Sequence, residues 1–233
     1  MPVVAVFDQQ AVEYDRWFDE HELVYQAEVA ALRKFISPTG LGIEVGVGTG
    51  RFAIPLGIRF GIDPSRGMLD IAQERGLRVC QAVGERLPFR DEQFDLVLLV
   101  TVICFVDDVP TLLRELSRVL KLGGHLVIGF IDRNSELGRR HESRKEVSVF
   151  YRDARFYSVE DVAACVRGAG FGSPRFCQTL LDVPGDWSPR ELVTRDGYGE
   201  GAFVALSARK QEGEQGIADR VESNALLKQR IHQ

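Results

Sequence analysis

The 233-residue chain is 45% hydrophobic and 27% charged, which is ordinary for a globular protein and enough for one large domain with a buried core. A formal net charge of -5 argues against a general nucleic-acid-binding surface, and no apolar run approaches the ~20 residues needed to span a bilayer, so we expect neither partner. The four cysteines lack C-x-x-C spacing and the first residues lack the features of a secretory signal. We therefore expect a cytoplasmic protein with buried, reduced thiols and no metal site.

The N-terminal segment predicts helical structure. Residues 1–10 have only mild strand or coil character, whereas residues 11–35 place aromatic and aliphatic side chains at near-helical spacing among many charges. A Ser-Pro-Thr-Gly run at 37–40 then ends the helix. Its aromatic residues, including Tyr14 and Trp17, fit either a cover over one end of the core or a lid over a ligand. We therefore set residues 1–36 apart as a helical cap.

A glycine-rich loop follows the first predicted strand, at 41–45, and precedes a predicted helix at 51–57. Its glycines stand at alternate positions: Gly46, Gly48 and Gly50. Glycine permits positive φ and lets a ligand approach the backbone. A dinucleotide fingerprint would place its third glycine at Arg51. Glu44, before the first glycine, would repel a pyrophosphate but suits a cationic amino group.

Strands and helices alternate after this loop. We expect strands at 59–62, 77–81, 94–100 and 124–131, and helices at 66–75 and 108–120. This alternation predicts a parallel sheet with both faces covered. Asp63 ends the second strand, at a spacing near the ~20 residues expected for a ribose-binding carboxylate.

The segment 133–157 interrupts the alternation and carries seven basic residues against four acidic ones up to residue 156. Arg152 and Arg155 stand beside aromatic residues and could grip a carboxylate through two parallel hydrogen bonds. The segment therefore predicts one wall of an acceptor site for a negatively charged substrate. A solvated helix with its charges facing water is the alternative.

The last part of the chain predicts the far edge of the sheet. A helix begins after Ser158, strands follow at 176–181 and 202–206, and residues 184–199 are loop-like. Residues 210–233 form a polar tail with one weakly amphipathic stretch.

Four segments in order across about residues 40–130 resemble motifs of the class I S-adenosylmethionine (SAM)-dependent methyltransferases, in their type 11 branch. They are E-V-G-V-G-T-G from Glu44, D-P-S-R-G-M-L from Asp63, A-V-G-E-R-L-P-F with F-D-L-V from Ala82, and R-E-L-S-R-V-L-K-L-G-G from Arg114. Leu122 stands where the family usually has proline, and Val83 stands where many relatives have an adenine-binding acid. The resemblance implies an α/β, Rossmann-like fold with a mostly parallel seven-stranded sheet, helices on both faces, and a SAM-binding domain over 37–209.

The resemblance also implies the ligands and their site. SAM is the cofactor and S-adenosylhomocysteine its product. Glu44 would orient the methionine ammonium, Asp63 would hold the ribose hydroxyls, and Pro64 and Met68 would flank the adenine. The full set of expected cofactor-binding residues is Glu44, Gly46, Val47, Gly48, Gly50, Asp63, Pro64, Met68, Gly84, Glu85 and Thr101. The expected substrate-binding residues are Tyr14, Trp17, Arg152 and Arg155.

The predicted function is methyl transfer to a small-molecule acceptor. No residue stands out as a general base, so the catalytic group is unknown. A non-catalytic SAM- or S-adenosylhomocysteine-binding regulatory module and a nicotinamide-dependent oxidoreductase are the alternatives, since fold and cofactor alone do not decide function. The sequence leaves the oligomeric state open, a homodimer included.

Overall fold

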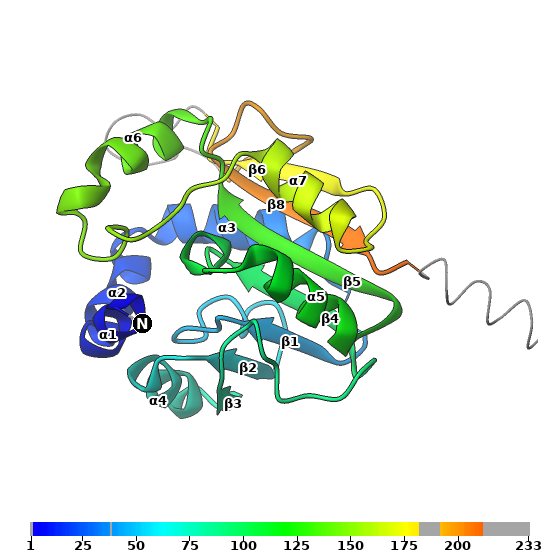
Figure 1. Ribbon diagram of the computed structural model, residues 1–233. Helices are drawn as coiled ribbons and strands as arrows, with labels where there is room; N and C mark the ends of the chain where they lie inside the picture. The colour runs from blue at the N-terminus through cyan, green and yellow to red at the C-terminus, as the bar shows by residue number, and fades with distance from the viewer. Residues whose placement is uncertain (1, 38, 182–191, 212–233) are drawn as a thin grey trace, which may run out of the picture.

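The computed structural model describes residues 2–37, 39–181 and 192–211, in which a single sheet carries helices on both faces (Figure 1). The sheet has eight strands in the order β3-β2-β1-β4-β5-β8-β6-β7. Their bounds are β1 Gly42–Val45, β2 Phe60–Asp63, β3 Arg78–Gln81, β4 Phe94–Val100, β5 Leu120–Ile131, β6 Arg175–Thr179, β7 Arg195–Asp196 and β8 Phe203–Arg209. Strands β1 to β5 pair with one another in parallel, and β8 is inserted antiparallel between β5 and β6.

This topology confirms the predicted α/β fold. The strand order reverses between β1 and β4, and ligands in such sheets bind beyond the carboxyl ends of the strands at that point. Strand β4 is central because Val97, Leu98 and Leu99 are fully buried, which requires apolar cover on both faces. The sheet has one strand more than the seven expected, because two residues of the predicted loop pair with β6 as β7.

Helices α5 and α7 pack on one face of the sheet, and α3 and α4 pack on the other (Figure 1). Their bounds are α3 Glu22–Arg33, α4 Arg66–Glu74, α5 Val109–Val119 and α7 Val159–Gly168. Three of these helices begin at side-chain caps. The Ser65 hydroxyl accepts from the Met68 N–H, Asp108 accepts from Thr111, and Ser158 forms a capping box with Asp161.

The N-terminal segment differs from the prediction. Residues 1–10 were expected as strand or coil, but Pro2–Gln9 form helix α1, and the expected helix 11–35 is broken at His21 into α2 (Ala11–Glu20) and α3. Tertiary contacts explain α1, because the Asp8 carboxylate at its end accepts hydrogen bonds from the Ser65 hydroxyl at 2.6 Å and the Gly67 N–H at 2.9 Å.

Two further expectations were wrong. Residues 51–57 form successive turns instead of a helix, because Pro55 lacks an N–H and Gly57 adopts φ 75°. Cys80 is an exposed free thiol, whereas Cys104 and Cys177 are buried.

The insert contains helix α6 (Glu136–Arg144) and a 3-10 turn at Lys145–Val147. The amphipathic stretch expected within the polar tail, and most of the predicted loop, lie outside the described residues.

Candidate functional site

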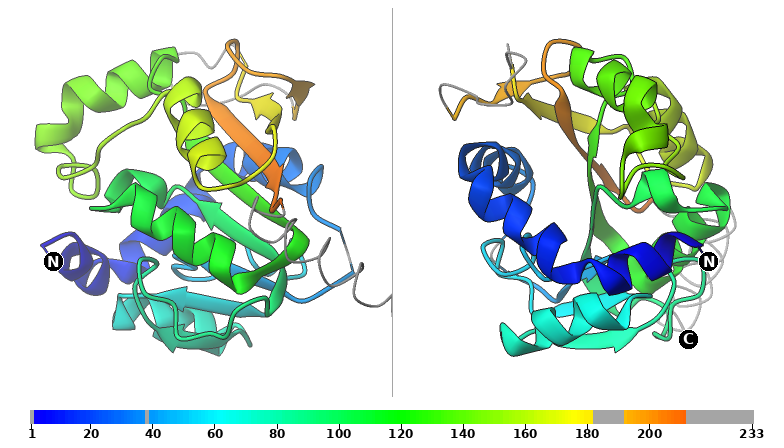
Figure 2. Two further views of the ribbon diagram at one scale, coloured as in Figure 1. Left: turned by 45° about the vertical axis from the view of Figure 1, so that its right-hand side comes forward. Right: turned by 90° about the vertical axis from the view of Figure 1, so that its left-hand side faces the viewer.

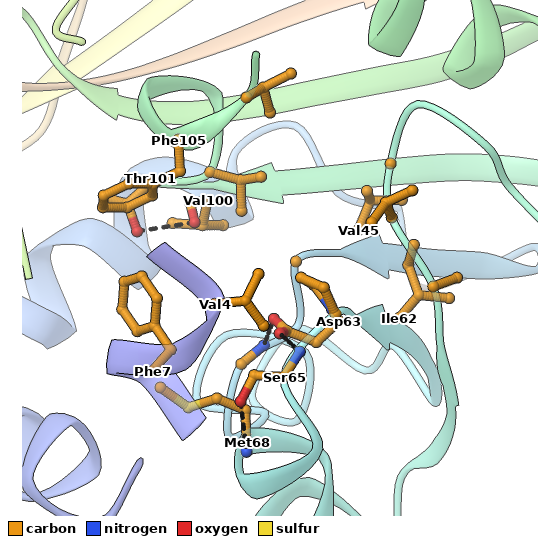
Figure 3. Close-up of a pocket in the computed structure, with 18 of the residues that line it drawn as sticks. Val4, Phe7, Val45, Ile62, Asp63, Ser65, Met68, Val100, Thr101 and Phe105 are labelled. Carbon is orange, nitrogen blue, oxygen red and sulfur yellow. Dashed lines mark hydrogen bonds between the residues drawn. The ribbon is translucent and has the colours of Figure 1, made fainter. Parts of the chain in front are cut away.

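A cavity of about 180 Å³ lies at the carboxyl ends of β1, β2 and β4, where the strand order reverses. Asp63, Ser65 and Met68 form one side, and Thr101 and Phe105 form the opposite side (Figure 3). We refer to it as the first cavity. Its position is the one expected for the ligand of an open α/β sheet.

The glycine loop shapes this cavity through its backbone. The N–H groups of Gly46 and Val47 both donate to the Ile62 carbonyl at 2.8 Å, which holds the loop against β2. Gly46 has φ 74°, and a Cβ there would lie 2.2 Å from Val102 Cγ2. Gly48 instead faces open space, because a Cβ would meet only Tyr14, at 3.8 Å. The loop therefore leaves room for a ligand to approach the main chain.

Asp63 presents an ordered carboxylate to the first cavity. One oxygen accepts from the Gly48 N–H at 3.0 Å and the other from the Ser65 N–H at 2.8 Å. Burial raises the pKa of Asp63 to about 6, although these two hydrogen bonds act in the opposite direction. Each oxygen keeps a further lone pair, so the ionised carboxylate can accept hydrogen bonds from two hydroxyls.

Glu44 lies beneath the loop and does not line the cavity. The residue is 1% exposed, and its Oε2 has no hydrogen-bond partner among the described residues. Burial raises the pKa of Glu44 well above its ordinary value. A buried acceptor without a hydrogen-bond donor destabilises the folded protein. A cationic group bound at the loop would supply the missing donor.

The structure brings most of the expected site residues together. The first cavity is lined by Tyr14, Gly46, Gly48, Asp63, Pro64, Met68, Gly84, Glu85 and Thr101. Val47 and Gly50 belong to the same loop but, like Glu44, do not line it. Thr101 has φ 54°, which is unusual for a residue with a branched side chain. Its hydroxyl donates to the Val100 carbonyl at 2.8 Å.

The N-terminal helices close the first cavity, and an ion-pair network ties them to the glycine loop. Val4 and Phe7 of α1 line the cavity (Figure 3). Asp15 of α2 pairs with Arg51 at 2.7 Å and Arg75 at 2.6 Å. It also accepts from the Thr49 hydroxyl at 2.6 Å. Sequence reasoning missed these contacts because they join residues far apart in the chain.

A second cavity, of about 420 Å³, adjoins the first. Both are lined by Phe7, Tyr14, Thr101 and Phe105. Trp17 lines only the second cavity. The insert contributes a wall that includes Leu137, His141, Arg144, Phe150 and Tyr151. Figure 2 shows the N-terminal helices and α6 at the same end of the sheet.

The two arginines expected to bind substrate lie elsewhere. Arg152 and Arg155 are exposed and line neither cavity. The Arg155 guanidinium lies 5.4 Å from the centre of the Tyr157 ring. These arginines are next to aromatic residues in the sequence, but they do not lie at either cavity.

A buried acid that sequence reasoning missed lines the second cavity. Glu28 of α3 is 5% exposed, and burial alone raises its pKa to about 8. Burial also lowers the pKa of His141 to about 4. One sequence signal could have found Glu28, because it stands four residues from both Val24 and Leu32, within the apolar stripe of the helix.

The described residues contain neither a membrane-spanning helix nor a group of side chains that could hold a metal ion. Among residues 2–37, 39–181 and 192–211, no helix is long and apolar enough to cross a membrane. In the same ranges, histidine, cysteine and carboxylate side chains form no group of three that could hold a metal ion.

Comparisons with known proteins agree with the geometry. A family model described as a methyltransferase domain matches residues 43–128. A SAM-dependent methyltransferase from Thermotoga maritima, described as a possible histamine N-methyltransferase, has a crystal structure that superposes with a TM-score of 0.84 at 45% identity, covering 89% of this chain and 99% of that one.

Two relatives extend the comparison. An uncharacterized protein of Methanocaldococcus jannaschii is 46% identical over 205 residues, which is 88% of this chain and 98% of that protein. A demethylmenaquinone methyltransferase of Streptomyces griseus is 32% identical over 141 residues, covering 54% of this chain and 59% of that enzyme.

Proposed function

The chain belongs to the class I SAM-dependent methyltransferases, and from that premise we propose that its methyl acceptor is a small molecule bound in the second cavity. As an enzyme of this family it uses SAM, not a nicotinamide cofactor. SAM supplies an electrophilic methyl group on a sulfonium sulfur. The acceptor therefore needs a site next to the one that holds SAM.

The residues of the first cavity fit SAM. Gly48 keeps the loop backbone open to a ligand, and Asp63 offers free lone pairs for the ribose hydroxyls. The orphaned Glu44 oxygen beneath the loop suits the positive charge of the methionine ammonium. Met68 and Glu85 line the remaining wall, where we assign the adenine. These side chains bind and align the donor, and alignment can contribute several kcal/mol to methyl transfer.

The proposed location of the acceptor rests on the second cavity. It shares four lining residues with the first, so an acceptor within it would lie beside the SAM site. The N-terminal helices and the insert cover it, which favours a small molecule over a macromolecular segment. The Thermotoga relative, described as a possible histamine N-methyltransferase, supports an acceptor of this size.

Labelled SAM provides the test. The purified protein is incubated with methyl-labelled SAM and a cell extract divided by ultrafiltration into small-molecule and macromolecular fractions. We expect label in the small-molecule fraction, and less label after Tyr14→Ala, which alters the wall shared by both cavities. Label confined to protein or nucleic acid would refute the proposal, and a reaction without extract measures background.

A further inference from the structure

Glu28 is a buried acid at the wall of a cavity and has no obvious structural purpose. It lies on α3 among the buried residues Val24, Ala27 and Leu32. Within the described part of the chain, no hydrogen bond or charged neighbour offsets the effect of burial on its pKa. A buried carboxylate without a partner is destabilising. Because Glu28 faces the second cavity, we expect a ligand in that cavity to provide the missing partner of the carboxylate.

The rest of the cavity indicates the charge of that ligand. Aromatic rings surround it, including Tyr14, Trp17, Phe18, Phe150 and Tyr151. The faces of such rings attract cations, and desolvation strengthens the attraction. A carboxylate enclosed by aromatic rings is suited to a protonated amine and unsuited to an anion.

The other titratable groups of the wall agree with this charge. They are Tyr14, His21, His141, Arg144 and Tyr151. Burial raises the pKa of both Tyr14 and Tyr151, with a smaller contribution from the Glu28 charge, so these hydroxyls stay neutral. His141 is neutral at pH 7 because burial lowers its pKa. Arg144 is exposed, at the end of α6.

We propose that the second cavity binds an amine as the methyl acceptor, with the Glu28 carboxylate as the partner of its ammonium group and the acceptor of its proton. This inference rests on the proposed small-molecule function. It replaces the negatively charged substrate expected from Arg152 and Arg155, which face neither cavity.

The proton transfer makes the amine a nucleophile. An ammonium nitrogen has no free lone pair, so one proton first moves from nitrogen to a Glu28 oxygen. The freed lone pair then forms the N–CH3 bond while the S–CH3 bond of SAM breaks and its electron pair stays on sulfur. The products are an N-methylammonium ion and S-adenosylhomocysteine. Because burial raises the pKa of Glu28 to about 8, the empty site holds a mostly protonated carboxyl, and the positive charge of an entering ammonium drives release of that proton to solvent. Glu28 is then ionised beside the bound ammonium and accepts its proton, and the cycle releases one proton in total.

The first experiment identifies the product labelled in the small-molecule fraction. We expect the methyl group on the nitrogen of a compound that is cationic at pH 7. Methylation of oxygen, carbon or sulfur, or of an anionic compound, would overturn the amine proposal and leave the small-molecule function intact. Label found only in macromolecules would refute both.

The second experiment tests Glu28 directly. With the acceptor identified, Glu28→Gln should lower kcat about a hundredfold or more, while Glu28→Asp, which keeps a carboxylate, should retain part of the rate. SAM affinity should not change in either variant. Glu22→Gln, an exposed residue of the same helix, is the matched control. An unchanged rate in Glu28→Gln would overturn the assignment.

A binding measurement separates charge from shape. Phenethylamine and phenylacetic acid have the same ring and chain length and opposite charge. Calorimetry in the presence of S-adenosylhomocysteine should give tighter binding of the amine, and Glu28→Gln should reduce that affinity at least tenfold. Tighter binding of phenylacetic acid would contradict the proposal, and if neither probe binds, the identity of the labelled product decides.

Discussion

The ion pairs of Asp15 lead to a quantitative prediction about the helices that cover the first cavity. Asp15→Asn removes the charge that holds two guanidinium groups, those of Arg51 and Arg75, at 2.7 Å and 2.6 Å. The side chains of all three residues are mostly buried, with exposed fractions of 15%, 17% and 27% for Asp15, Arg51 and Arg75. Both ion pairs are therefore poorly screened by solvent.

The size of the effect follows from these contacts. Charge-assisted hydrogen bonds contribute about 1.5–3 kcal/mol each, and removal of one member of a buried pair costs about 3–5 kcal/mol. Asparagine retains an acceptor for Thr49, so we expect about 2–3 kcal/mol for local opening of α1 and α2. This free energy corresponds to amide exchange about 30-fold to 160-fold faster.

Hydrogen-exchange mass spectrometry without ligand measures this opening. Peptides from residues 2–20 should exchange faster in Asp15→Asn, while peptides from β4 should keep wild-type rates. Glu13→Gln is the control, because Glu13 pairs with Arg16 on an exposed surface of the same helix. Wild-type exchange over residues 2–20 in Asp15→Asn would refute the view that this network holds the cover in place.

Three further predictions concern the two cavities. Asp63→Ala should weaken SAM binding about ten- to a hundredfold in calorimetry, because a charge-assisted hydrogen bond contributes ~1.5–3 kcal/mol; a folded variant with unchanged affinity would contradict the ribose assignment. SAM should slow amide exchange of residues 11–25, and equal rates with and without SAM would leave Tyr14 and Trp17 as structural cover. The free energy of unfolding should fall as pH rises from 4.5 to about 8, because the folded state keeps a proton on Glu28 that the unfolded state has released. Urea unfolding at pH 6 and pH 9 should show a smaller fall in Glu28→Gln than in wild type, and equal falls would count against the raised pKa.

The residues that line the first cavity were largely predictable because most of them are close together in sequence. The strand, the glycine loop and Asp63 lie within about one βα unit, and strand ends of a parallel sheet must converge. The loop conformation that Gly46 adopts follows from residue type. Strand β4 was equally clear, because residues 96–100 are all apolar, as expected for a central strand with cover on both faces.

The N-terminal helices and the second cavity were less predictable because contacts between residues far apart in the chain determine them. Helix α1 has a β-branched, apolar sequence, and its docking depends on Asp8 meeting Ser65, 57 residues away. In the sequence, Arg51 stands where a dinucleotide fingerprint would have its third glycine. In the structure, its guanidinium forms an ion pair with Asp15 of α2. Glu28 resembled one more charge on a helix, and only the packing of α3 shows that it faces a cavity.

The ring of Phe7 gives the two cavities a common cover, and this has a consequence for turnover. Phe7 lines both cavities and stacks on Phe150 of the insert, with ring centres 5.5 Å apart. Departure of either product therefore disturbs the same contact between α1 and the insert. We expect this shared opening step to limit steady-state turnover, so that the first catalytic cycle appears as a rapid burst of S-adenosylhomocysteine in quenched-flow measurements. Phe150→Ala should shrink the burst relative to the steady-state rate, since it removes this stacking contact between α1 and the insert.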